Sequence, residues 1–140
     1  MLTGEYRHSV DPKNRLFIPA KHREELGNSF MIVKDVRGPR LKVYSMGAWE
    51  AYIAPIRSQE RKLAEAALRF LHKDAVTAEP DSQGRVLLTP ALLQYAGITK
   101  EAVIVGCADY AEIWAADVYD AEMAAENPET LRAALELLGL

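Results

Sequence analysis

The segment "DPKNRLFIPA", residues 11–20, is the most informative part of the chain because a second version of it, "DSQGRVLLTP", occupies residues 81–90. Both versions begin with an Asp, place an Arg four residues later, continue with an apolar run and include a Pro near their end. A shift of 70 residues superposes the two Asp residues and the two Arg residues. A pattern written twice in 140 residues indicates an internal duplication.

The similarity between the two halves continues beyond these segments. The alignment slips by two residues, so that "MIV" (31–33) meets "VIV" (103–105), and then returns to a shift of 70, where Trp49 meets Tyr119. Two homologous units are expected to show such a change in the alignment shift, followed by a return to the original shift in a loop. We therefore predict two copies of one supersecondary unit, rather than two unrelated turns.

Each copy has the same expected order of elements. A strand, a tight turn and a second strand come first, followed by a short helix, a pair of strands and another helix. In the second copy Thr89 suits the N-cap, Pro90 the first helical position and Gly97 the left-handed position after the helix. The expected leading strands are 4–10, 15–18, 75–80 and 85–88; the strand pairs are 29–33 with 41–44 and 102–106 with 111–114; the final helices are 46–54 and 116–126.

The geometry of the turns explains part of the repeated motif. Asp81 suits the first position of a type I turn, where its carboxylate accepts N–H groups two residues on, and Gly84 supplies the positive φ that closes a hairpin. Asp11 and Asn14 fit the same positions in the first copy, since Asn tolerates the left-handed region better than most residues.

Two further helices are expected outside the copies. Residues 56–74 show an apolar face at helical spacing, starting after Pro55 and consisting of Ile56, Leu63, Ala67, Phe70 and Leu71. At the end of the chain Asn127 is a candidate N-cap for a helix with the apolar stripe Leu131, Ala134, Leu135 and Leu138. So short a helix is marginal alone in water, so it should dock, on its own subunit or on a neighbour.

Composition indicates an ordinary soluble globular chain, with 49% hydrophobic and 26% charged residues. The polar start resembles no signal peptide and no apolar stretch could span a bilayer, so we expect a cytoplasmic protein.

The net charge of −3 is distributed unevenly along the chain. Residues 1–44 contain nine Lys or Arg and five Asp or Glu, whereas residues 75–140 contain three and eleven. Because charges are screened beyond about 8 Å, the N-terminal half could still meet an anionic partner.

The turn geometry does not require the two arginines. One interpretation of Arg15 and Arg85 is a weak surface pair with the Asp of the same turn. The other is a guanidinium held in a fixed pose and presented to an anion or a base edge. Recurrence in both copies favours the second interpretation, as does the cationic surrounding of the first copy: Arg7, His8, Lys13, Arg15, Lys21 and Arg23.

Enzyme chemistry finds little support. No two His residues have metal-ligand spacing, the chain has no phosphate-binding or nucleophile-elbow motif, and its acidic residues follow helical faces. The single cysteine, Cys107, excludes an intramolecular disulfide and is expected to be a small buried hydrophobic residue rather than a nucleophile. We expect no catalytic residue, no metal site, no cofactor and no small-molecule substrate.

The runs "TGEYRHSVDPKNRLFIPAKHREEL" and "DSQGRVLLTPALLQYAGITKEAVIVG", together with "EIW", resemble the MraZ family of bacterial regulators, which have two SpoVT/AbrB-like halves. The resemblance extends over most of residues 1–123, and both DxxxR motifs lie where the family has them. Asn14 stands where Gly is usual, and His22 replaces a usual aromatic residue. Neither departure removes a DxxxR residue.

The resemblance implies an α+β fold, namely a tandem-repeat SpoVT/AbrB-like swapped-hairpin, β-barrel-like domain with flanking short helices that assembles into a ring of identical subunits. The implied organisation is a first repeat over 5–52, a linking helix over 53–74, a second repeat over 75–123 and a helical tail over 124–140.

The implied function is that of a nucleoid-associated regulator that binds repeated boxes in the promoter of the division and cell-wall gene cluster. Its partners are double-stranded promoter DNA and further copies of itself. Arg15, held by Asp11, would read a base in the major groove, and nearby cations would contact phosphates. The expected DNA-binding set is Arg7, Asp11, Lys13, Asn14, Arg15, Lys21, Arg23, Asp81 and Arg85.

A non-DNA-binding scaffold, or an antitoxin-like module of the AbrB fold group, stays open as the alternative, because one fold supports several functions. The aromatic residues Trp49, Tyr52, Trp114 and Tyr119 are candidate interface anchors for such a module. Their matched positions in the two copies favour the core instead.

Overall fold

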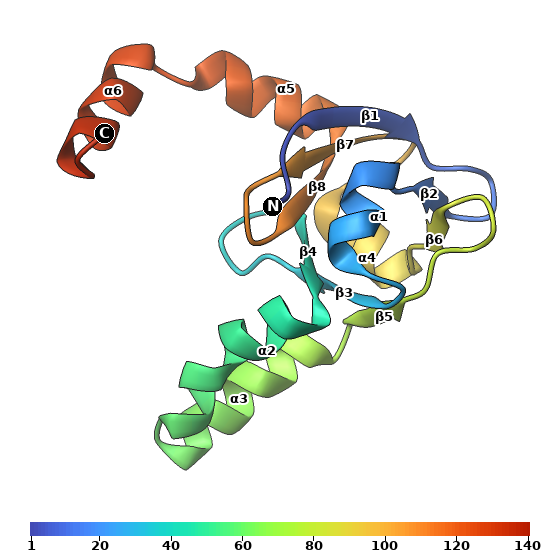
Figure 1. Cartoon of the computed structure of the whole chain (residues 1–140), viewed down its shortest axis with the longest axis horizontal. Coiled ribbons are helices and arrows are strands. Elements are labelled where there is room, and N and C mark those ends of the chain that lie inside the picture. Colours follow the sequence, from blue (N-terminus) through green and yellow to red (C-terminus); the bar gives the residue numbers. More distant parts are fainter.

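The computed structural model describes all 140 residues as an α+β structure (Figure 1). A six-stranded antiparallel sheet has the order β1-β7-β8-β4-β3-β5, and a separate two-stranded ribbon pairs β2 with β6. The strands are β1 (Glu5–Ser9), β2 (Arg15–Phe17), β3 (Phe30–Lys34), β4 (Leu41–Ser45), β5 (Val76–Ala78), β6 (Arg85–Leu87), β7 (Glu101–Gly106) and β8 (Ala111–Ala115). The helices are α1 (Ala20–Leu26), α2 (Met46–Ile53), the 3-10 turn η1 (Ala54–Ser58), α3 (Arg61–His72), α4 (Pro90–Ala96), α5 (Ala116–Ala125) and α6 (Pro128–Leu137).

The predicted duplication is confirmed by the register of the strands. At the centre of the sheet β4 pairs with β8, its equivalent in the other half, and Lys42 lies opposite Glu112, the residue 70 positions later. At the ends of the sheet Tyr6 pairs with Ile104 and Val76 with Ile32. These two pairs are equivalent only if the alignment slips by two residues at β3 and β7, as the sequence indicated.

The two halves exchange strands, because β1 pairs with β7 of the second half and β5 pairs with β3 of the first. The expectation that each turn closes a hairpin between its own flanking strands is therefore wrong. After each turn the chain leaves the large sheet, and β2 pairs only with β6. Residue alternation could not reveal this, since it fixes which face a strand buries and not which strand lies beside it.

Side chains of alternating strand residues divide the interior into separate clusters. Phe30 and Ile32 of β3 join the main core, which lies between the sheet, the ribbon, α1 and α4. Met31 and Val33 point to the opposite face, where they pack with α2 and α3. A third cluster, of Val103, Trp114 and Tyr119, lies under α5. The sheet is thus covered on both faces at β3, and every residue of this strand is buried.

The expected caps of the short helices are partly present. Thr89 caps α4 by accepting a hydrogen bond from the Leu92 N–H, and Gly97 ends the helix in the left-handed region. No side chain caps α1, which begins after Pro19. Tertiary packing, rather than capping, therefore holds α1 in place, with its buried His22 and Leu26.

The linking segment differs from the single helix expected over 56–74. Its first residues form η1, and α3 begins only at Arg61, where the Glu60 carboxylate accepts the N–H groups of Lys62 and Leu63. The face buried by α3 is also rotated from the expected one. It contains Ala64, Leu68 and Leu71, whereas Leu63 and Phe70 are exposed.

Two helical segments, the α2–α3 pair and the α5–α6 segment, project away from the sheet. In Figure 1 the α2–α3 pair points away from the sheet on one side, and α5 leads to α6 on another. Asn127 caps α6 as expected, but no residue of α6 is buried. The terminal helix therefore does not dock on its own chain. No helix is long and apolar enough to cross a bilayer.

The aromatic positions follow the expected core preference with one exception. Trp49, Trp114 and Tyr119 are buried, whereas Tyr52 is 41% exposed. Tyr52 stacks on Trp49 from the solvent side.

Candidate nucleic-acid interface

The two repeated turns are brought side by side by the β2–β6 ribbon. Leu16 pairs with Val86 at its centre, and both side chains are buried in the main core. The residue that follows each ribbon strand also forms a backbone hydrogen bond with the turn of the other half. The Ile18 N–H donates to the Gly84 carbonyl at 3.0 Å, and the Leu88 N–H donates to the Asn14 carbonyl at 2.8 Å. The two turns are therefore parts of one rigid unit, related by the same two-fold pseudosymmetry as the sheet.

Within each turn one carboxylate oxygen organises the backbone, as expected. Oδ1 of Asp11 accepts the N–H groups of Lys13 and Arg15, both at 2.9 Å. Oδ1 of Asp81 accepts those of Gln83 and Arg85 at the same distance. The residues that close the turns are left-handed in both halves, with φ of 61° at Asn14 and 81° at Gly84. The expected turn chemistry is confirmed.

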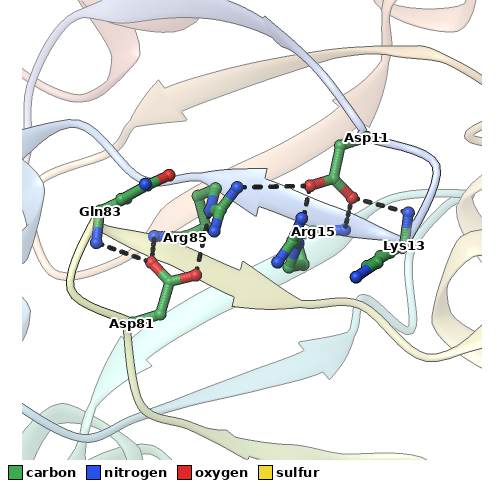
Figure 2. A network of polar contacts seen from close by, with 6 residues as sticks. All are labelled: Asp11, Lys13, Arg15, Asp81, Gln83 and Arg85. Atoms are coloured by element: carbon green, nitrogen blue, oxygen red, sulfur yellow. Dashed lines mark hydrogen bonds and ion pairs between the residues drawn. The ribbon is translucent and has the colours of Figure 1, made fainter.

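The second oxygen of each carboxylate fixes the orientation of an arginine. Nε of Arg15 donates to Oδ2 of Asp11 at 2.7 Å, and Nε of Arg85 donates to Oδ2 of Asp81 at 3.0 Å. Nη1 of Arg85 also lies 3.7 Å from Oδ2 of Asp11, so that one carboxylate lies between the two guanidinium groups. Figure 2 shows this network across the ribbon, with Lys13 and Gln83 at opposite ends.

Both arginines stay accessible at this surface. The exposed fraction of the side chain is 31% for Arg15 and 27% for Arg85. Each uses Nε for its own turn, which leaves most of the guanidinium N–H donors without a hydrogen-bond partner inside the chain. A planar group with a fixed orientation and free donors suits bidentate recognition of a base edge or a phosphate.

The hydrogen bonds of the turns also act on the ionisation of the carboxylates. The backbone N–H of Arg15, followed by its side chain and the N–H of Lys13, lowers the pKa of Asp11 below its ordinary value. The corresponding backbone bond from Arg85 lowers the pKa of Asp81. Both carboxylates are therefore ionised at neutral pH and can hold their arginines.

Two of the expected phosphate contacts are already engaged within the chain. Arg7 of β1 pairs with Asp120 of α5, its Nη2 lying 2.6 Å from Oδ1. Arg23 of α1 donates from Nε to the Ile18 carbonyl at 2.8 Å, and its guanidinium lies over the Phe17 ring. A Cβ atom at Gly84 would be only 2.6 Å from Cζ of Arg23, so this side chain also supports the turn of the second half.

The side chains of the two expected lysines, unlike those of Arg7 and Arg23, are not engaged within the chain. Lys13 and Lys21 are exposed and form no ion pair. Gln83 occupies in the second turn the place of Lys13 in the first, and the N–H of Gln83 donates to its Asp in the same way. Sequence reasoning missed Gln83 because an uncharged side chain gives no electrostatic signal. The shift of 70 residues that relates it to Lys13 was the signal available.

Other candidate chemistry lies outside this surface. No group of three or more His, Cys, Asp or Glu side chains is arranged to hold a metal ion. Cys107 is half-buried, and burial, followed by the nearby Glu112, raises the pKa of its thiol to about 11. A thiol that is protonated at neutral pH is a poor nucleophile.

The molecule is thus a duplicated α+β protein whose two halves exchange strands. On one ribbon it presents two arginines, each held by an Asp of its own turn. The chain belongs to the MraZ family. The family model described as "MraZ protein, putative antitoxin-like" matches residues 1–71 and again residues 70–136. The two matches correspond to the two halves seen in the strand register.

Individual relatives agree with this membership. A protein named "Transcriptional regulator MraZ" from Pelotomaculum thermopropionicum is 45% identical over 122 residues, which cover 86% of this chain and 83% of that protein. One of the same name from Caldicellulosiruptor bescii is 40% identical over 146 aligned positions, covering both chains completely. Another from Acetivibrio thermocellus is 35% identical, also over the full length of both.

Proposed function

We propose that the chain is a sequence-specific DNA-binding transcriptional regulator whose reading surface is the paired DxxxR ribbon. The observation that carries the proposal is the placement of Arg15 and Arg85 side by side, each oriented by its own Asp and each partly exposed. B-DNA's major groove is about 12 Å wide and admits a two-stranded ribbon, and Arg is the residue that most often reads guanine there. The relatives named as transcriptional regulators support the same function.

The roles of the individual residues follow from their surroundings. Arg15 reads a base edge, with Arg85 beside it, while Asp11, Asn14 and Asp81 hold the turns. Lys13 and Lys21, which have no ion pair in the chain, contact phosphates and set the orientation. Arg7 and Arg23 join them only if they exchange their present partners for phosphates, so they are the weaker contributors.

The target and the assembly complete the proposal. The targets are repeated boxes in the promoter of the division and cell-wall gene cluster, and the active form is a ring-shaped homo-oligomer in the nucleoid. One ribbon offers few cations, so its grip on DNA is weak. Several ribbons on one ring turn later contacts into intramolecular ones, which can raise affinity by about 10²–10⁴. The exchange of β1 and β5 between the halves supports a SpoVT/AbrB-like swapped-hairpin unit, with repeats over 5–52 and 75–123.

The test is binding of the purified protein to its own upstream DNA, measured as a function of salt. We expect Arg15→Ala to abolish specific binding, while Lys13→Ala lowers affinity for all sequences and reduces the log–log salt slope by about 1. Glu24→Ala, on the exposed side of α1, is the control. Binding that survives Arg15→Ala, or that is independent of salt, would contradict the proposal and favour a protein-binding scaffold.

A further inference from the structure

Two apolar stripes on separate helices lie outside the three hydrophobic clusters of the chain. On α6 and its C-cap, Leu131, Leu135 and Leu138 lie on one side at helical spacing, and all three are exposed. On α3, Leu63 and Phe70 lie on one side, with Ala66 between them. Leu63 is 61% exposed and Phe70 38%, and Nζ of Lys34 lies 4.1 Å from the centre of the Phe70 ring. Contiguous exposed apolar side chains of this kind mark interaction surfaces.

The two stripes match in length and in setting. In each stripe the first and last residues are seven positions apart, about 10 Å along a helix. On α3 the stripe is bordered by a row of basic residues with helical spacing, Lys62, Arg69 and Lys73. The arm that carries the other stripe, residues 116–140, contains six Asp or Glu and a single Arg. The acidic arm is therefore attracted to the basic row beside the α3 stripe, whereas two acidic arms placed together would repel each other.

The α6 stripe and the α3 stripe of one copy do not face each other. In Figure 1, α6 and the α2–α3 pair project from different sides of the sheet. Because the two stripes lie on different sides of one copy, a contact between them can repeat head to tail, with different surfaces of successive copies meeting. Contacts of this kind generate a ring when the rotation between neighbours closes.

We propose that α6 of one copy docks along the Leu63–Phe70 stripe of α3 in the next copy, and that this contact builds the assembly. The inference rests on the assembly part of the proposed function and names its interface. It also explains why a helix that is too short to be stable alone has kept an apolar stripe facing solvent. The acidic arm is thereby placed against the basic row and away from the ribbon.

The first experiment measures the mass of the assembly by sedimentation for the full chain and two single variants, Leu135→Asp and Leu63→Asp. We expect each variant to lose at least half of the assembled mass, while circular dichroism stays unchanged because both side chains are exposed in the monomer. Leu137→Asp is the matched control, since Leu137 is 90% exposed on another side of the same helix. Wild-type mass in both stripe variants would overturn the inference.

Cysteine cross-linking gives a second, independent test in a Cys107→Ser background. A chain with Leu63→Cys and Leu135→Cys should form a ladder of linked subunits on mild oxidation, and either substitution alone should not. An intramolecular link within monomers, or dimers formed by Leu135→Cys alone, would overturn the inference by showing that α6 binds its own chain or another α6.

Promoter binding by the same proteins separates this inference from the proposed function. We expect Leu135→Asp to lose about 100-fold in affinity, since avidity is lost while the ribbon is intact. If Leu135→Asp keeps both its mass and its affinity, the interface is wrong and the proposed function stands. If the wild-type assembly does not bind its promoter, the proposed function is wrong, whatever the cross-links show.

Discussion

Nη1 of Arg85 lies 3.7 Å from Oδ2 of Asp11, although the two residues belong to different repeats. The Asp11 carboxylate also binds the guanidinium of Arg15, whereas the Asp81 carboxylate pairs with one guanidinium, that of Arg85. The two turns are otherwise equivalent by pseudosymmetry, so this contact makes Asp11 the shared anion of the ribbon. It couples the two arginines that the proposed function requires.

This asymmetry can be measured through the ionisation of the carboxylates. Replacing Arg85 by Gln should raise the pKa of both Asp81 and Asp11, since each loses a neighbouring cation. Replacing Arg15 by Gln should raise the pKa of Asp11 alone. Carboxyl-carbon NMR titration of Asp11 and Asp81 in the three proteins checks this. An unchanged Asp11 in the Arg85 variant would show that the contact between the repeats is absent in solution.

The turns should also make stability depend on pH in a defined window. The pKa of Asp11 and of Asp81 is lower in the folded chain, because backbone N–H groups bind the ionised forms. The stabilisation is thus fully present above the unfolded value, 3.8 for Asp, and is lost as pH falls through the lower folded value. Asp81→Asn should be less stable than the wild type at pH 7, and the difference should shrink towards pH 3.

Denaturant unfolding at several pH values measures this difference. Asp117→Asn on exposed α5 is a suitable control, because its carboxylate accepts only the N–H of Val118. A stability difference between Asp81→Asn and the wild type that is the same at pH 7 and pH 3 would contradict the assignment.

Gly84 and Asn14 occupy equivalent left-handed positions and offer a matched pair of substitutions. Gly84→Ala should lower the free energy of unfolding by about 1–2 kcal/mol, because a Cβ is strained at φ 81°. A further loss is expected because the Cβ would lie 2.6 Å from Cζ of Arg23. Asn14→Gly should change stability by less than about 1 kcal/mol, since Gly accepts the same φ. Equal effects of the two substitutions in thermal or urea unfolding would refute this account.

The Cys107 thiol should react slowly at neutral pH. Burial and the neighbouring Glu112 raise its pKa to about 11, so only a small fraction is thiolate at pH 7. The rate of reaction with a disulfide reagent should therefore keep rising from pH 7 to pH 10, without the plateau of a free thiol. Glu112→Gln should increase the rate at pH 8. A plateau below pH 9 would show that the thiol is not perturbed.

Much of the fold could be predicted from local signals. The two DxxxR turns, the residues Asn14 and Gly84 that close them, the Thr89 cap and the Gly97 end of α4 all follow from backbone preferences of single residues. The slip of the alignment by two residues correctly indicated which residues of β3 and β7 are equivalent. The role of Asp11 and Asp81 in their own turns was predictable for the same reason.

Other features could not be predicted because they depend on long-range packing. The sequence gives no local sign that Arg23, whose place in the second half is taken by Leu93, supports the turn at Gly84. The rotation of the buried face of α3 has a similar origin, because the apolar residues of that helix extend around more than one side. The side of α3 that becomes buried is the one that packs against Met31, Tyr44 and Trp49.

The duplicated unit and the Asp-held arginine of each turn could be inferred from the amino-acid sequence alone, since each motif is made of residues close together in the chain. The exchange of β1 and β5 between the halves, the pairing of β2 with β6 and the common surface of Arg15 and Arg85 became visible only in the folded chain. The physical reason is that backbone pairing between distant strands is chosen by the burial of whole faces, and no single residue specifies its partner.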